Sequence, residues 1–384
     1  MEVVDLASDG LSWASSADYK YNDITELFGE KIVFPSYYRS DIPAIVSAER
    51  IIEQHHSLST YEIYAEDLRI LAWNWIPNSK YDRNYKYFIL SRTNSLLCDD
   101  IASDSTWLKY FGIFSNLDSN HVNLKIADNV SRVRFDDKVY QIALGGSHFG
   151  HWVADTVPKL LLNSERNPNL PQIFTRLTDL ESKFIGRLSK NSVSGIAIDL
   201  HGASLVQFSI PKALITVNFG LKRRHHFTQA NIARSYSIEH GFSKKKGCYL
   251  VRGHVDGHRR LENEDEIVLA SIRQGLDIIS PLNHPFFDLP KIFQEYSHFV
   301  YFNSSVNTNF NLLASKFAKA LAIVPTTYSV PTKELVLGAA AYQIPRLDST
   351  KICMLARSVS SGSHEQYLVD IAGYESELKS FLGN

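Results

Sequence analysis

The chain has 384 residues, of which 44% are hydrophobic and 21% are charged, and its formal net charge is −1. This composition is that of a folded globular protein long enough for about two domains, and the near-neutral charge argues against binding nucleic acid through a basic face. Three cysteines, Cys98, Cys248 and Cys353, are too few and too far apart for a disulfide framework or a CxxC metal motif, so we expect core thiols.

The N-terminal stretch MEVVDLASDGLSW is acidic and lacks the basic and apolar parts of a signal peptide. No apolar run reaches about 18 residues, so we expect no transmembrane helix. These features predict a cytoplasmic protein, with the inner face of the membrane as an alternative location.

The first third of the chain is mixed and rich in tyrosine and tryptophan. Apolar runs predict strands at 70–77 and 86–91, and helical spacing predicts a short helix at 47–57. The stretch QIALGG at 141–146 predicts a strand that runs into a glycine turn.

Strands and helices alternate more clearly from residue 248 onward, which predicts right-handed βαβ units and a parallel sheet in a Rossmann-like domain at about 215–345. In the first of these helices Asn263 is placed to cap the N-terminus, with Glu266 three residues on as in a capping box, and Gly275 to end it. The expected strands are 248–252, 276–280, 298–302 and 320–325, and the expected helices are 262–275, 288–297, 309–319 and one within 362–384.

Two loops follow expected strands at the carboxyl edge of the sheet, where doubly wound sheets bind ligands. The first carries Arg252, Arg259 and Arg260 beside a helix N-terminus, an arrangement that suits a diphosphate. The alternative is a solvated loop whose arginines pair with Glu262, Glu264 and Asp265.

The second loop, FNSSVNTNFN at 302–311, is made mostly of small polar residues that can offer N–H groups and hydroxyls to phosphate or sugar. It has neither a Walker motif nor GxGxxG, which argues against an ordinary nicotinamide site. The alternative is a plain turn capped by Thr308 or Asn309. The candidate ligand-binding residues are Asn303, Ser304, Ser305, Thr308 and Asn309.

The stretch GGSHFGHWVADTVPKLLL at 145–162 combines an apolar pattern with polar groups. In a helix His151, Asp155 and Lys159 would share one face, with Pro158 shortening or kinking the helix. Asp155 beside an imidazole is a candidate general base. In the alternative, His151 is a core residue and Asp155 pairs with Lys159. The opposite, buried side would hold Trp152, Val153, Val157, Leu160 and Leu161.

A zinc site that adds His148 is the weakest interpretation of this stretch, because HxxHxxxD is not HExxH. The basic segment KRRHHF at 222–227 could face a polyanionic acceptor, a lipid diphosphate or a membrane surface. The alternative for this segment is a solvated loop.

These motifs together resemble glycosyltransferase family 61. HWVADTVPKL (151–160) is similar to the family's HWLLDTLPRL-like segment, and YLVRGHVDGHRRLENEDEIV resembles its block of strand, arginine-rich loop and acidic helix. QGLDIISP (274–281) and FVYFNSSVNTNFNLL (299–313) fall where the family has a glycine-strand-proline element and a GPHGAGLTN-like loop. The resemblance covers about 140–330 in the same order.

The resemblance implies an α/β protein of GT-B fold, with two Rossmann-like domains facing across a cleft. It implies 1–212 as an acceptor-side domain, 213–345 as a nucleotide-sugar-binding domain and 346–384 as a tail packing back on the N-terminal domain. Arg252, Arg259 and Arg260 would bind the diphosphate, and Thr308 and Asn309 match the Thr-Asn end of the later loop. Asp155 and His151 would face the cleft, with His148, Lys159 and Asn263 as further candidates.

The implied activity is inverting, metal-independent sugar transfer from a nucleotide sugar, UDP-type favoured, without a cofactor. The acceptor would be an oligosaccharide, a polysaccharide or a lipid-linked glycan, in capsule or other bacterial surface polysaccharide synthesis. The sequence departs from the family pattern in the later loop, where Asn303 and Ser304 replace a histidine and a glycine. This departure bears on the identity of the donor. Two alternatives follow, a non-catalytic sugar-nucleotide- or glycan-binding module and a metal hydrolase using His148, His151 and Asp155.

Overall fold

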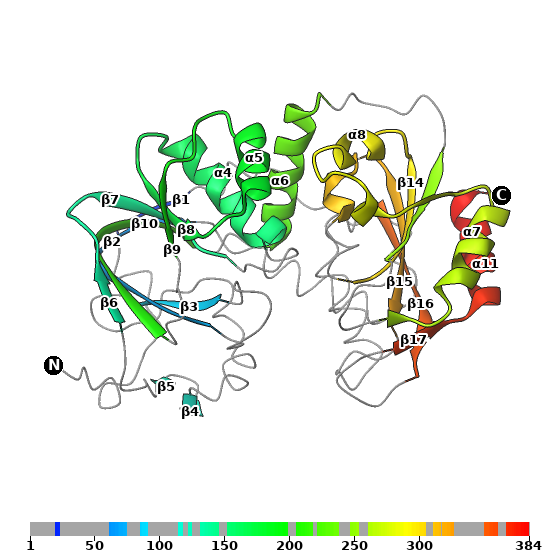
Figure 1. The fold of residues 1–384 in the computed structure, drawn as a ribbon, viewed down its shortest axis with the longest axis horizontal. Coiled ribbons are helices and arrows are strands. Elements are labelled where there is room, and N and C mark those ends of the chain that lie inside the picture. Colours follow the sequence, from blue (N-terminus) through cyan, green and yellow to red (C-terminus); the bar gives the residue numbers. More distant parts are fainter. Residues whose placement is uncertain are drawn as a thin grey trace. The chain divides into compact units, whose positions relative to one another are not determined.

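The chain forms two compact units in the computed structural model (Figure 1). Unit 1 comprises Met1–Gly29 and Leu58–Arg224, and unit 2 comprises Glu30–Ser57 and His225–Asn384. The structure describes residues 61–74, 85–90, 114–117, 122–124, 131–145, 152–198, 205–217, 221–237, 246–252, 260–304, 310–315, 317–325, 349–359 and 366–383, and the backbone of 20–23.

Unit 1 is built on a sheet of eight described strands in the order β1-β2-β10-β7-β8-β9, with β3 paired to β2 and β6 to β10. β10 runs antiparallel to β2 but parallel to β7, and β7 and β8 are also parallel. A separate pair joins β4 (Phe114–Leu117) to β5 (Val122–Leu124). The strands of the sheet are β1 (Lys20–Asp23), β2 (Tyr61–Asn74), β3 (Tyr85–Leu90), β6 (Ser131–Arg134), β7 (Val139–Ala143), β8 (Gln172–Thr175), β9 (Gly195–Ile198) and β10 (Leu205–Val217).

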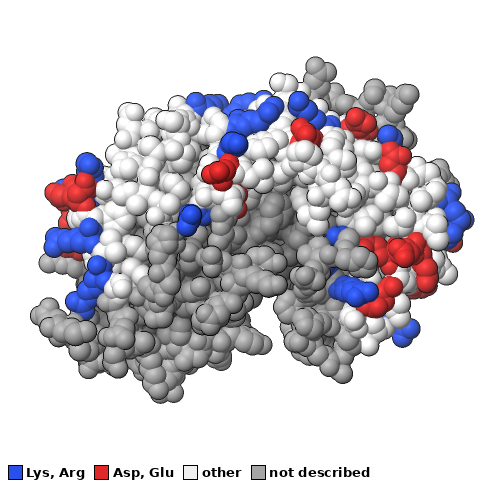
Figure 2. All heavy atoms as spheres, in the orientation of Figure 1, with Lys and Arg blue, Asp and Glu red and all other residues white. Residues whose placement is uncertain are grey.

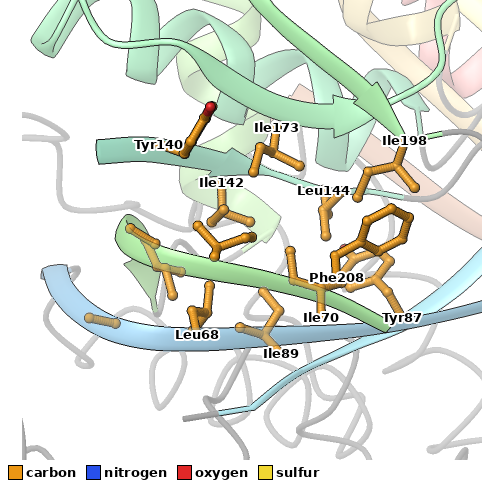
Figure 3. Close-up of a cluster of buried hydrophobic side chains, with 14 of the residues drawn as sticks. Leu68, Ile70, Tyr87, Ile89, Tyr140, Ile142, Leu144, Ile173, Ile198 and Phe208 are labelled. Carbon is orange, nitrogen blue, oxygen red and sulfur yellow. The ribbon is translucent and has the colours of Figure 1, made fainter. Parts of the chain in front are cut away.

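A break in the long β2–β10 ladder keeps the apolar side chains of both strands on one face. Pro211 has no N–H to give to the ladder. Opposite it, Asp67 has a φ of 50°, and pairing continues at Lys212 and Glu66. At this point the alternation of buried and more exposed side chains shifts by one residue in both strands. A single cluster therefore collects apolar side chains from six strands of the curled sheet (Figure 3).

The opposite face of this sheet carries helices (Figure 1). A π-helical turn, η4 (Trp152–Thr156), leads into α4 (Val157–Arg166), which packs on β7, β8 and α5 (Asp179–Leu188). Thr178 and Glu181 form a reciprocal capping box at the start of α5. The division between the two units falls inside α6 (Leu221–Ser235), directly after Arg224.

Unit 2 contains a seven-stranded sheet in the order β12-β17-β16-β15-β14-β11-β13. The five neighbouring strands β13, β11, β14, β15 and β16 all run parallel. β11 lies between β13 and β14, so the strand order reverses at β11. This confirms the parallel sheet predicted from the alternating pattern. The strands are β11 (Gly247–Leu250), β12 (Arg260–Leu261), β13 (Asp277–Ile279), β14 (His298–Phe302), β15 (Lys319–Pro325), β16 (Thr350–Ser358) and β17 (Gln366–Val369).

Helices cover both faces of the unit 2 sheet (Figure 1). α7 (Glu264–Arg273) and α11 (Ile371–Leu382) share a core with Val300 and Phe302 of β14. Phe299, on the other face of the same strand, contacts Phe293 of α8 (Leu289–Phe293) at a ring distance of 5.3 Å. The thiols of Cys248 and Cys353 are buried in this sheet, as expected, and Cys98 lies outside the described residues. Burial raises the pKa of Cys353 to about 12.

Charged side chains of both signs lie next to one another on unit 2 (Figure 2). Lys351 and Glu377 approach to 2.6 Å between β16 and α11, and Arg273 and Glu375 to 2.5 Å between α7 and α11. Exposed pairs of this kind contribute little to stability. Packing of buried Tyr374 and Leu378 is therefore the main attachment of α11.

Two expectations from the sequence differ from the structure. Of the helix expected at 309–319, Phe310 is helical and the 3₁₀ turn η6 (Asn311–Leu313) follows it, but the described residues after η6 are not helical and β15 begins at Lys319. Asn263 precedes α7 but makes no side-chain cap, although Gly275 ends the helix region at a φ of 79°, as predicted. The described part of the tail adds β16, β17 and α11 to unit 2.

Candidate active site

The segment that carries Asp155 forms a π-helical turn directly before helix α4. Pro158 stands at the second position of α4 and cannot donate to the carbonyl of Ala154, and the preceding residues form the π-turn η4. Every residue from Trp152 to Ser164 is buried, the polar Asp155 and Lys159 as well as the apolar side chains. Burial decreases only at the end of α4, where Glu165 is partly exposed and Arg166 is exposed.

Asp155 forms an ion pair with Arg224, whose Nη1 lies 3.0 Å from the Asp155 Oδ1. Both side chains are almost completely buried, at 7% and 4% exposure. Lys159, the partner considered from the sequence, instead donates from its amine to the carbonyl of Leu144 at 3.0 Å. The carboxylate is therefore held by a residue from a different helix.

The Asp155–Arg224 pair lies where the strand order of unit 1 reverses. β7 has β8 on one side and β10 on the other, all parallel, with Ile142 in register with Ile215. Asp155 follows β7 in the chain, and Arg224 follows β10. Ligand sites in such sheets lie beyond the carboxyl ends of the strands at the point of reversal. The pair is thus at a position that commonly binds ligands.

A close approach between the end of β7 and η4 explains why a glycine stands at position 145. A Cβ on Gly145 would lie 2.2 Å from the Oγ1 of Thr156 and 2.8 Å from its backbone nitrogen. The Gly145 carbonyl also accepts a hydrogen bond from Thr175 at 3.0 Å. Only glycine leaves room for η4 here, and η4 in turn carries Asp155.

Sequence reasoning missed Arg224. The segment KRRHHF was expected to be either a surface patch or a solvated loop, and both are wrong for Arg224 and His225, which are 3% and 2% exposed on α6. The helical spacing of buried Arg224, Thr228 and Ile232 was the one available signal. This spacing does not stand out, because a buried helix face is usually recognised by apolar residues and two of these three side chains are polar.

In unit 2 the two predicted loops begin at adjoining strand ends. β11 and β14 are parallel neighbours, with Leu250 opposite Tyr301, so Arg252 and Asn303 follow directly at the same edge. Arg252 is 7% exposed, and Asn303 and Ser304 are 1% and 2% exposed. The Asn303 N–H donates to the carbonyl of Ile323, which extends the ladder by one residue. This edge is the reversal point of the unit 2 sheet.

Glu264 ties the start of α7 to the end of β11. Its Oε1 accepts the backbone N–H of Arg252 at 2.8 Å and the hydroxyl of Tyr249 at 3.4 Å. Burial raises the pKa of the Tyr249 hydroxyl well above its usual value, and the Glu264 charge raises it further, so the hydroxyl remains a donor. A carboxylate in the first turn also suits the helix dipole.

Two other candidates of the arginine block have structural partners. The Asn263 side chain donates to the Val369 carbonyl at 2.9 Å and accepts its N–H at 3.0 Å, which fixes β17 beside α7. Arg260 is exposed and lies 3.4 Å from Glu262, as in the alternative of a loop arginine paired with an acidic neighbour. The remaining candidates lie outside the described residues and stay predictions: His148, His151, Arg259, Ser305, Thr308 and Asn309.

Comparison with protein families finds one match, over a segment that carries the polar residues beyond both strand-order reversals. Residues 149–316 match the family Glycosyltransferase 61. The Glycosyltransferase 61 segment includes Asp155, Arg224, Arg252 and Asn303, and the match supports a glycosyltransferase, with a sugar donor and a glycan acceptor as partners. No curated protein matches the chain significantly. Within the described residues, no helix has the combined length and apolar character needed to cross a bilayer.

Proposed function

We propose that the protein is an inverting, metal-independent glycosyltransferase of GT-B architecture, which moves a hexose or pentose from a UDP-type donor to a hydroxyl of a glycan or glycolipid. The observation that carries the proposal is the Glycosyltransferase 61 match over 149–316. The adjoining strand ends that carry Arg252 and Asn303 support a donor site in unit 2. The proposed setting is capsule or surface polysaccharide synthesis in the cytoplasm, at the inner face of the membrane.

The proposed reaction is a direct displacement at the anomeric carbon. The acceptor oxygen bonds to C1 as the bond from C1 to the diphosphate oxygen breaks, which inverts the configuration. The hydroxyl proton passes to Asp155, or to His151 with Asp155 orienting it. Arg252 and Arg259 stabilise the charge that grows on the leaving diphosphate. The Arg224 guanidinium beside Asp155 favours the charged carboxylate, which both roles of Asp155 require.

The test begins with the wild-type protein and a panel of nucleoside mono- and diphosphates in a thermal-shift assay. We expect UDP to raise the Tm more than UMP, because ligands that bind only the folded state stabilise it. Transfer from the matching nucleotide sugars is then measured with and without a chelator. Absence of transfer from every donor, or its loss with the chelator, contradicts the proposal.

A second candidate is a non-catalytic sugar-nucleotide- or glycan-binding module. It is favoured by the burial of Asn303 and Ser304, which replace a histidine and a glycine of the family pattern. Such a module would show thermal shifts with nucleotides but neither transfer nor hydrolysis. Turnover of any nucleotide sugar therefore excludes it.

A further inference from the structure

The ion pair between Asp155 and Arg224 joins two segments that follow different strands. Asp155 stands in the π-turn after β7, and Arg224 stands in the first turn of α6 after β10. Their atoms approach to 3.0 Å, and both side chains are more than nine-tenths buried. The pair is thus an interior feature of unit 1, at the reversal point of its sheet.

The backbone on the Asp155 side is already held by other contacts. Gly145 packs against Thr156, and Lys159 bonds the Leu144 carbonyl, so the π-turn is fixed against the end of β7. These contacts place the backbone of Asp155, but they leave the rotamer of its carboxylate to be set by its own neighbours. The guanidinium of Arg224 is a charged group 3.0 Å from that carboxylate.

A buried ion pair is weak evidence for stability, because desolvation offsets much of the attraction and apolar residues of similar volume often stabilise as well. Removing only one partner is costly, since it leaves a buried charge alone. A pair of this kind at a strand-order reversal is therefore better suited to setting the position of a functional carboxylate than to holding the fold.

The geometry points to Arg224 as a positioning residue, which fixes the Asp155 carboxylate for its part in sugar transfer. This inference rests on the proposed function, and it holds whether Asp155 takes the proton or orients His151. In this role Arg224 acts through the Asp155 carboxylate and not on the substrate itself. Its contribution is to keep the carboxylate in one orientation, and small misplacements of a catalytic group can cost about 10²-fold in rate.

The test compares wild-type enzyme with Arg224→Met, Arg224→Lys, Asp155→Asn and the double variant Asp155→Asn/Arg224→Met. We expect Arg224→Met to lower kcat about 10²-fold while leaving the donor KM nearly unchanged. Arg224→Lys retains the charge and should recover part of kcat. The double variant should be no slower than Asp155→Asn, because residues that act as a unit are not additive. Arg234→Met, an exposed change on the same helix, is the matched control.

Thermal unfolding of the same variants distinguishes an effect on the orientation of the Asp155 carboxylate from an effect on the stability of the fold. Arg224→Met and Asp155→Asn should each lower Tm, and the double variant should recover part of the loss, because it removes both charges of the pair together. If Arg224→Met does not fold, Arg224→Lys and the double variant still report the coupling.

Three outcomes overturn the inference and are distinct from failure of the proposed function. The first is a wild-type kcat in Arg224→Met, and the second is a double variant whose kcat loss is the product of the single losses. The third is a loss in Arg224→Met that merely follows the fraction unfolded. Failure of the proposed function is seen separately, as absence of transfer by the wild-type enzyme.

Discussion

The contact between Glu264 and the end of β11 makes a quantitative prediction about the donor site. Glu264→Ala removes the acceptor for the Arg252 N–H at 2.8 Å and for the Tyr249 hydroxyl at 3.4 Å. Leaving a buried donor unpaired costs about 1–3 kcal/mol, and the lost charge at the start of α7 adds about 0.3–1 kcal/mol. Because the Arg252 contact is only part-buried, we expect about 1–3 kcal/mol less unfolding free energy.

The matched controls lie in the same helical turn. Asp265→Ala and Glu266→Ala remove exposed carboxylates that share the helix-dipole interaction, and their unfolding free energies should fall by only about 0.3–1 kcal/mol. Urea unfolding measures all three variants, and Glu264→Gln, which keeps an acceptor oxygen, should regain part of the loss. Titration calorimetry with UDP should show weaker binding for Glu264→Ala than for either control, because the backbone N–H of Arg252 loses its acceptor.

The reasoning is refuted if Glu264→Ala matches the two controls in both unfolding free energy and UDP affinity. A loss of stability without a change in UDP affinity would keep the structural contact but remove its link to the donor. Wild-type behaviour of Glu264→Gln alone would instead show that the acceptor oxygen, and not the charge, is what matters.

Three further outcomes are expected. Arg252→Ala should weaken UDP binding in calorimetry, and an unchanged Kd would remove Arg252 from the donor site. Gly145→Ala should lower the unfolding free energy by about 1–3 kcal/mol through overpacking, since its Cβ would lie 2.2 Å from the Thr156 Oγ1, and wild-type urea unfolding would contradict the close approach. The hydrogen bond from Lys246 and then that from Tyr296 lower the pKa of Asp277, so its stabilisation is present above the unfolded-state pKa and is lost as pH falls through the folded-state pKa. Asp277→Asn should therefore flatten the fall of Tm between about pH 5 and pH 3, and a fall as steep as in the wild-type protein would rule this out.

Local signals in the sequence identified much of unit 2. The apolar runs at 298–302 and 320–325 coincide with β14 and β15, and Gly275 adopts the positive φ expected after a helix. These features depend on residues close together in the chain, namely side-chain periodicity and glycine's freedom at positive φ. The parallel direction of the strands follows from the alternation of strands and helices, because a helical connection usually returns the chain to a parallel strand.

The sequence by itself thus determined the alternating strands of unit 2, the strand that leads to Gly145 and the family resemblance of the segment around Asp155. The tertiary structure alone decided the partners of the polar side chains. Asn263 pairs with Val369, which lies 106 residues away, instead of capping its own helix, and Asp155 pairs with Arg224 instead of Lys159. The physical reason is that a buried polar group must find a partner in space, and only the packed strands and helices determine which groups are near enough.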